Sequence, residues 1–321
     1  MKPALSIVHK TFKHAVAGLV VMALWSGFLP SILQAQPQTF SPQPPHPAGA
    51  SRQSFTVVDD RDITVTLDSP ATRIISLAPS MTELLFSLGV GENVVGVVEY
   101  SDYPEAAKQI PIVGRFDRLD VERILSLQPD LIISWQSGNP RGAIQRLREM
   151  GYPVYTAEPV TVASIADTLL RLGSLTGQTE RADTLSTTIH DSVEKLQRQY
   201  ADATTVSVFY QVWHNPIISV GGNELINDMI MVCGGENIFA DLPVGPAVNL
   251  EDIISRRPQV ILASGPSPDR PDWLDLWQQW PSIPAVADNH LYAIPPDLVQ
   301  RHSLRALQGL EQMCTLIDQA R

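Results

Sequence analysis

Residues Asn93–Asn139 read NVVGVVEYSDYPEAAKQIPIVGRFDRLDVERILSLQPDLIISWQSGN. Two apolar, β-branched runs in this stretch, Val94–Val98 and Leu131–Ser134, are typical of buried parallel strands. Between them, Leu119–Leu127 carries apolar residues at helical spacing and Asp120 is a suitable N-cap, so this segment is predicted to be a helix. The stretch therefore predicts a βαβ unit. Ligands of open α/β sheets bind where the loops leave the carboxyl ends of the strands.

Part of this unit occurs twice in the chain. The segment LDVERILSLQPDLIIS at Leu119–Ser134 aligns without gaps with VNLEDIISRRPQVILA at Val248–Ala263. A second pair, SLGVGEN at Ser87–Asn93 and MVCGGEN at Met231–Asn237, occurs in the same order. Two repeats in one order favour two similar α/β lobes. The cleft between two such lobes is a favoured site for a ligand.

The pattern of apolar and polar residues divides the 321 residues into five segments. They are a leader (1–35), a disordered tether rich in Pro, Gln and Ser (36–54), an N-terminal α/β lobe (55–160), connector helices (161–201) and a C-terminal α/β lobe (202–321). The connector includes a long helical period, Thr179–Tyr200. The predicted fold class is α/β, with two Rossmann-like lobes whose mostly parallel sheets are joined by one long rigid helix.

A further helix is predicted from Pro79 to Leu88, after an apolar strand at Arg73–Leu77. Ser80 and Glu83 have the spacing of a capping box, in which the serine caps the helix and the glutamate bonds back to it. Glu83 is thus expected to stabilise the start of its own helix.

The first 35 residues have the pattern of a signal peptide. Three lysines precede an apolar run at Ala15–Leu24, and Ala35 is a suitable residue before a cleavage point. Pro30 interrupts the apolar region, so an uncleaved leader that tethers the protein to the membrane is the less favoured alternative. A net charge of −11 indicates a soluble protein without a basic surface for nucleic acid. We expect an exported, periplasmic protein.

The sequence lacks the common motifs of catalysis. It contains no G-x-S-x-G elbow, H-E-x-x-H pair, Walker loop or G-x-G-x-x-G turn. Its two cysteines are too few for a thiolate metal cage. A metal site built from His214, His302 and Asp297 has no paired ligand spacing to support it. We therefore expect no catalytic residues, no metal ligands and no cofactor.

Cys233 and Cys314 are the only cysteines of the chain. In an exported protein an even number of cysteines indicates a disulfide. Two separate buried thiols are the alternative, and the sequence alone does not decide between them.

Aromatic residues follow two of the predicted strands. Trp135 and Trp213 each come directly after an apolar strand, and each precedes polar loop residues. Flat apolar rings that face each other across a cleft suit a large planar ligand. Asp297 and Arg301 are either a surface ion pair or polar groups that bind amide or phosphate groups of the ligand.

Glu122 and Glu251 stand at the same register of the two repeated helices. Each alone is explained by the helix dipole, which favours acidic residues in the first turn. The dipole does not explain why both lobes place a glutamate at this register. The two carboxylates are therefore predicted to dock a symmetric partner that carries arginines.

Four segments resemble the periplasmic cobalamin-binding proteins of vitamin-uptake ABC importers. They are RIISLAPSMTELLFSLG (73–89), VVGVVEYSDYP (94–104), VERILSLQPDLIISWQSGN (121–139) and CGGENIF (233–239). The resemblance runs from about Arg73 to the C-terminus. More broadly, these segments resemble the helical-backbone class (class III) of periplasmic binding proteins, which also carries ferric siderophores and haem.

This resemblance implies a role for individual residues. It implies ligand contacts for Tyr100, Phe116, Trp135, Asp297, Leu298, Val299, Gln300 and Arg301, docking to permease arginines for Glu122 and Glu251, and a disulfide between Cys233 and Cys314. Phe116 stands where the family has a tryptophan, and Gly245-Pro246 stands where it has Trp-Pro. We expect Trp213 to complete the aromatic wall of the cleft there.

The sequence thus predicts a monomeric binding protein that delivers cobalamin or a related corrinoid to an importer permease and its ATPase. The departures at Phe116 and Gly245 keep a ferric siderophore or haem as the alternative ligand. A hydrolase or metal-dependent enzyme is the third hypothesis. It requires a nucleophile–base or metal-ligand group that the sequence does not show.

Overall fold

The computed structural model describes residues 54–266 and 269–321. The expected signal peptide (1–35) and all but the last residue of the expected tether (36–54) lie outside these ranges. Within the two described ranges, no helix is both long and apolar enough to cross a membrane.

Four parallel strands form the sheet of the N-terminal lobe. Along the chain they are β3 (Ile74–Ser76), β4 (Val94–Val97), β7 (Leu131–Trp135) and β8 (Val154–Ala157). In the sheet they lie in the order β4-β3-β7-β8. Nearly every residue of these strands is buried, which is why the sequence shows continuous apolar runs instead of alternation.

The sheet of the C-terminal lobe repeats this topology. Its strands along the chain are β9 (Val206–Gln211), β12 (Gly235–Asn237), β13 (Val260–Ala263) and β14 (Leu291–Ala293). They are again all parallel and lie in the order β12-β9-β13-β14. In both sheets the first strand lies between the second and the third. The strand order therefore reverses at the same place, and a ligand crevice is expected at the carboxyl ends there.

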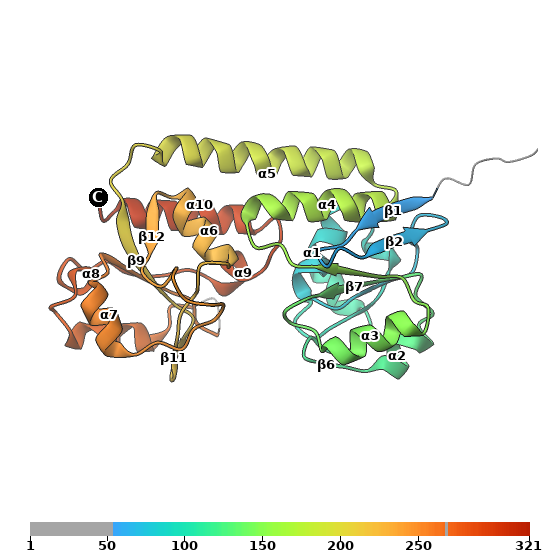
Figure 1. The fold of residues 1–321 in the computed structure, drawn as a ribbon, viewed down its shortest axis with the longest axis horizontal. Helices are drawn as coiled ribbons and strands as arrows, with labels where there is room; N and C mark the ends of the chain where they lie inside the picture. Colours follow the sequence, from blue (N-terminus) through green and yellow to red (C-terminus); the bar gives the residue numbers. More distant parts are fainter. Residues whose placement is uncertain (1–53, 267–268) are drawn as a thin grey trace, which may run out of the picture. The chain divides into compact units, whose positions relative to one another are not determined.

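The sequence repeat occupies matching positions in the two lobes. Its first copy forms α2 (Val121–Ser126) and β7, and its second forms α7 (Leu250–Arg256) and β13. Asp120 caps α2 by accepting a hydrogen bond from the Arg123 amide at 3.0 Å, and Asn249 caps α7 in the same way. The two lobes appear side by side in Figure 1. The predicted class of two α/β lobes with parallel sheets is confirmed.

Short helices and hairpins complete each lobe. In the N-terminal lobe they are hairpin β1 (Phe55–Val58) with β2 (Thr64–Leu67), α1 (Pro79–Ser87), η1 (Gly91–Asn93), η2 (Glu105–Gln109), hairpin β5 (Gly114–Arg115) with β6 (Arg118–Leu119), and α3 (Arg141–Glu149). In the C-terminal lobe they are hairpin β10 (Trp213–His214) with β11 (Ile217–Ile218), α6 (Leu225–Val232), η3 (Asp272–Gln279), α8 (Pro284–Ala287), α9 (Pro296–Val299) and α10 (Ala306–Asp318).

The start of α1 differs from the prediction. The N-cap is Ala78, which offers no side-chain hydrogen bond, and Pro79 occupies the first turn. Proline suits this position because its fixed φ is already helical and its missing N–H would have no partner. Ser80 therefore lies inside the helix, and the predicted capping box is wrong. Glu83 instead bonds to arginines of the other lobe.

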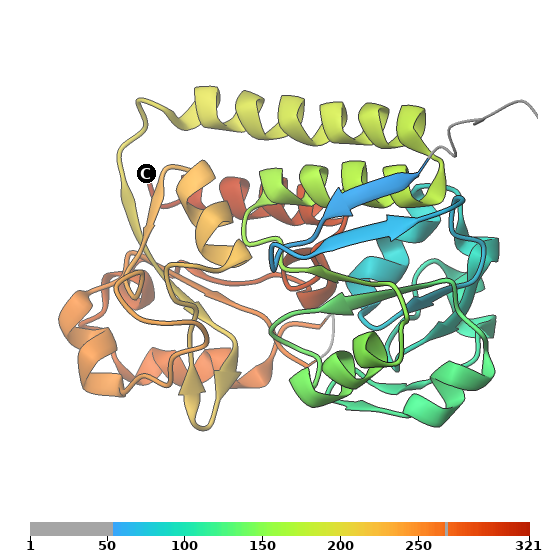
Figure 2. The same cartoon turned by 45° about the vertical axis from the view of Figure 1, so that its right-hand side comes forward.

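Two long helices connect the lobes. Helix α4 (Val162–Thr176) leads into α5 (Thr179–Tyr200) through Gly177, which adopts a left-handed conformation with φ of 72°. At 22 residues, α5 is roughly 33 Å long. Figures 1 and 2 show α5 running from one lobe to the other with α4 alongside it. One apolar core contains residues of α4, α5 and both sheets, so the connector is packed against the lobes along its length.

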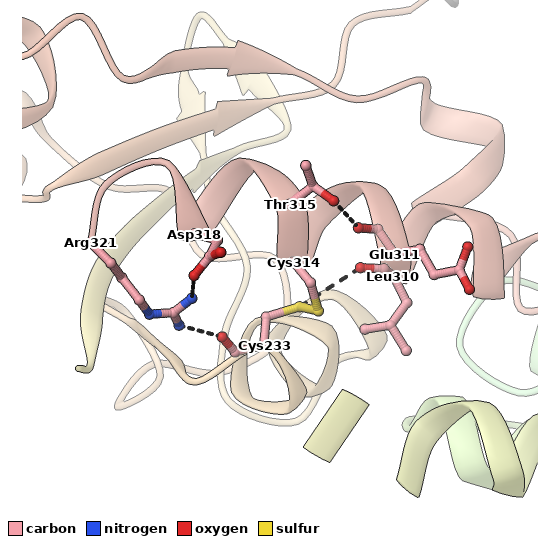
Figure 3. The surroundings of a disulfide bond; sticks show 7 residues. All are labelled: Cys233, Leu310, Glu311, Cys314, Thr315, Asp318 and Arg321. Atoms are coloured by element: carbon pink, nitrogen blue, oxygen red, sulfur yellow. Dashed lines mark hydrogen bonds and ion pairs between the residues drawn. A yellow bond between two sulfur atoms is a disulfide. The ribbon is translucent and has the colours of Figure 1, made fainter. Parts of the chain in front are cut away.

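A disulfide joins Cys233, at the end of α6, to Cys314 in α10, which confirms the expected pair (Figure 3). The C-terminal residue holds the same region together, since Arg321 donates a hydrogen bond to the Cys233 carbonyl at 2.5 Å and pairs with Asp318 at 2.7 Å. The cross-link therefore fixes the last helix of the chain to α6.

Removing the disulfide is expected to lower the free energy of unfolding substantially. The bond closes a sequence separation of 81 residues. Its removal frees the unfolded chain and should cost about 4 kcal/mol. Urea denaturation with and without reductant measures this loss. The variant Cys233→Ser/Cys314→Ser should unfold at the lower urea concentration and should not respond to reductant. An unchanged midpoint in reduced wild-type protein would contradict the prediction.

Candidate functional site

Two cavities at the carboxyl ends of the strands are lined by residues of both lobes. The first, of about 240 Å³, is lined by Tyr100, Phe116 and Trp135 from the N-terminal lobe and by Asp297, Gln300 and Arg301 from the C-terminal lobe, among others. The second, of about 440 Å³, extends from Trp135 toward Val212 and Val244. Both cavities are lined by Trp135, Gln300 and His302. They are therefore two parts of one cleft between the lobes.

The first cavity is lined by aromatic rings of the N-terminal lobe. Trp135 ends β7, and its ring centroid lies 5.9 Å from that of Phe116, which sits in the turn between β5 and β6. Tyr100 follows β4 and is 66% exposed. Its φ of 67° is unusual for a residue with a side chain, and such strain is concentrated at ligand sites. The rings thus offer flat apolar faces to the cleft.

Two neighbouring residues hold Trp135 in place. The buried amide of Asn139 accepts a hydrogen bond from the Trp135 backbone N–H at 2.7 Å and donates to the carbonyls of Leu77 and Phe116. A Cβ on Gly138 would lie 1.9 Å from the Trp135 ring, so only glycine fits there. Gly138 and Asn139 close one of the segments that carry the family resemblance, but their role in holding Trp135 could not be recognised from the sequence.

Arg301 is held by three carboxylates that come from both lobes. Its Nη1 lies 2.9 Å from Glu83 and 2.8 Å from Asp102, and its Nε lies 2.9 Å from Asp297. Burial opposes the charge of Arg301, but hydrogen bonds to Asp102 and Glu83 raise the pKa of its guanidinium above the ordinary value. Asp297 and Arg301 thus pair with each other and also line the first cavity.

His302 lies between α9 and α10 and lines both cavities. Its ring centroid is 6.5 Å from that of Trp135 across the cleft. Burial lowers the pKa of His302 to about 4, so the imidazole is neutral at neutral pH. From the sequence, His302 was considered only as a possible ligand in a metal site with His214 and Asp297, which was not favoured. Its place at the junction depends on how the lobes pack, which no local pattern reveals.

The remaining predicted ligand contacts lie in different surroundings. Trp213 is in the β10–β11 hairpin, is 41% exposed, contacts the ring of His214 and lines neither cavity. The structure therefore does not bring it to the wall that it was expected to complete. Val299 is buried and lines the second cavity. Leu298 packs against the core and lines neither cavity.

No metal site is formed by the part of the chain that the structure describes. No group of three or more His, Cys, Asp or Glu side chains is placed there to hold an ion. His214 stacks on Trp273 with ring centroids 5.7 Å apart, whereas His302 lines the cleft.

Glu122 and Glu251 occupy the second position of α2 and of α7. Both are exposed, and neither forms an ion pair with a residue that the structure describes. Figures 1 and 2 show α2 and α7 on the side of the two sheets away from α5. Each lobe thus presents an exposed glutamate carboxylate at the same helical position.

Comparisons with known proteins agree on one family. The family model described as periplasmic binding protein matches residues 74–298. A vitamin B12-binding protein of Vibrio campbellii is 35% identical over 257 residues, which cover 79% of this chain and 92% of that protein. One of Yersinia pestis is 36% identical over 245 residues, which cover 76% and 85%.

Solved structures have the same fold. The periplasmic vitamin B12-binding protein BtuF of Vibrio cholerae matches with a TM-score of 0.72 and 34% identity, covering 78% of this chain and 98% of that one. The periplasmic heme-binding protein RhuT of Roseiflexus, in its apo form, matches with a TM-score of 0.69 and 26% identity, covering 78% and 100%.

Proposed function

The chain belongs to the periplasmic binding protein family, and from this premise we propose that it binds cobalamin or a related corrinoid and delivers it unchanged to an ABC importer. One observation carries the proposal. Aromatic rings of one lobe, Tyr100, Phe116 and Trp135, line the same cavity as the polar groups of the other lobe. The name of the relatives at 35% identity supports the same ligand.

The chemistry of the cleft suits a corrinoid. A corrin ring is broad and flat and carries amide groups at its edge. Aromatic faces such as that of Trp135 bury its apolar surface, and side chains such as Asp297 and Gln300 can bond to its amides. Asn139 and Gly138 hold Trp135 in place before the ligand binds. Ordering this side chain therefore costs little free energy on binding.

Removing two aromatic side chains should weaken ligand binding. Trp135→Ala with Tyr100→Ala is expected to raise the Kd for cyanocobalamin at least about tenfold, since each lost aromatic contact is worth on the order of 1 kcal/mol. Calorimetric titration of the purified protein measures the change. Trp213→Ala is a matched control, because its ring lines neither cavity and its loss should leave the Kd unchanged. An unaltered isotherm for the double variant would remove these residues from the site.

Haem or a ferric siderophore is the second candidate ligand. Where the family has Trp-Pro, this chain has Gly245-Pro246, and a Cβ at Gly245 would meet no atom within 4 Å. The neighbouring Val244 is exposed and lines the second cavity, so that part of the cleft is open. Parallel titrations with cyanocobalamin, haem and a ferric siderophore distinguish the candidates by affinity.

The segment boundaries and the route of export belong to the same proposal. Residues 1–35 would direct export, 36–54 would separate the leader from the lobes, and 55–160, 161–201 and 202–321 would form the N-terminal lobe, the connector and the C-terminal lobe. The importer's permease and ATPase would be the partners, and the protein would act as a monomer.

A further inference from the structure

One imidazole in the cleft has no hydrogen-bond partner among the residues that the structure describes. His302 lines both cavities, and no hydrogen bond joins its ring nitrogens to any described residue. The two residues before it in the chain are already bonded. Gln300 donates to Ser264 at 2.6 Å, and Arg301 is held by carboxylates. The His302 ring thus lines the cleft while neither of its nitrogens has a hydrogen-bond partner among the described residues.

The position of His302 determines which part of a bound ligand lies next to its ring. A flat ligand that fills both cavities must cross their junction, which is formed by Trp135, Gln300 and His302. The centre of such a ligand then lies near the junction. In a corrinoid or a haem the centre is the metal ion, and a neutral imidazole is a common ligand of cobalt and iron.

We propose that His302 coordinates the metal of the bound macrocycle through a ring nitrogen and displaces an exchangeable axial water. The nitrogen donates its electron pair, the metal–oxygen bond breaks and water leaves, so no oxidant or reductant is needed. This inference rests on the proposed function and adds a preference to it. The protein should favour a corrinoid whose axial position holds water over one whose axial position holds cyanide.

Absorption spectroscopy of the purified full chain tests the inference. Aquocobalamin and cyanocobalamin are each added, and the visible spectrum and the Kd are recorded. Wild-type protein is expected to shift the aquocobalamin bands to those of a nitrogen-ligated cobalt and to leave the cyanocobalamin bands in place. His302→Ala should abolish the shift. Its loss of affinity for aquocobalamin should exceed its loss for cyanocobalamin at least about tenfold.

The controls separate this inference from the proposed function. His190→Ala, at an exposed position of α5, should keep the shift. If wild-type protein binds both corrinoids without a shift, or if His302→Ala keeps it, the inference is wrong and the proposed function stands. If neither corrinoid binds, the proposed function itself is wrong. If the variant does not fold, the wild-type spectra still test the inference, because the absence of a shift for aquocobalamin overturns it.

Discussion

Replacing Glu122 and Glu251 together by alanine is expected to abolish the stimulation of the importer's ATPase by the loaded protein. Both carboxylates are exposed at the second position of matched helices, and neither has an ion-pair partner among the described residues. Such groups contribute little to the stability of the free protein. In a docked complex each would pair with an arginine and lose its water. Truncating one member of a charge pair of this kind costs about 2 kcal/mol or more.

The ATPase rate of the reconstituted importer, measured against the concentration of loaded protein, gives the result. Each single variant should require a higher concentration for half-maximal stimulation, and the double variant should give none in the same range. Glu194→Ala, an exposed glutamate on α5, is the matched control and should stimulate fully. Corrinoid affinity of the double variant should stay at the wild-type value, because both residues lie outside the cleft. Full stimulation by the double variant would show that these glutamates do not dock.

Elements that depend on local periodicity could be predicted from the sequence. The predicted bounds of the long helix, Thr179–Tyr200, coincide with those of α5, because its apolar face repeats without interruption and Gly177 ends the helix before it. The repeat at Leu119–Ser134 and Val248–Ala263 also located matching parts of two sheets. Since parallel strands leave their loops at one edge, the repeat placed Trp135 at the carboxyl end of its sheet.

Features that depend on distant contacts could not be predicted. Ser80 and Glu83 had the spacing of a capping box, but the partners of Glu83 are more than 200 residues away, at Arg301 and Arg305. Trp213 follows an apolar run as Trp135 does, yet the chain turns back there as a hairpin and the Trp213 ring lies outside both cavities. Trp135 ends a strand of the parallel sheet, whereas Trp213 lies in a short hairpin, and the apolar run before each residue does not reveal this difference.

Glu83→Ala is expected to destabilise the protein by about 3–5 kcal/mol, the range for breaking a buried ion pair. The Glu83 side chain is 3% exposed and lies in α1 of the N-terminal lobe. It accepts hydrogen bonds from Arg301 at 2.9 Å, from Arg305 at 2.5 and 3.0 Å, and from Ser303 at 2.6 Å. All three donors belong to the C-terminal lobe. Loss of the carboxylate would leave two partly buried guanidinium groups with too little compensating charge.

Urea denaturation of Glu83→Ala and of wild-type protein measures this cost. The dependence of the free energy of unfolding on urea concentration should be compared between the two. Glu83→Gln keeps the size of the side chain and some of its hydrogen bonds but removes its charge, so its loss should be smaller. Glu194→Ala breaks an exposed ion pair with Arg198 and should change the free energy of unfolding by no more than about 0.5 kcal/mol. Because the Glu83 contacts join the lobes beside the cleft, Glu83→Ala should also weaken corrinoid binding through Arg301, which lines the first cavity. If Glu83→Ala and Glu194→Ala unfold at the same urea midpoint, the contacts between the lobes do not depend on the Glu83 carboxylate.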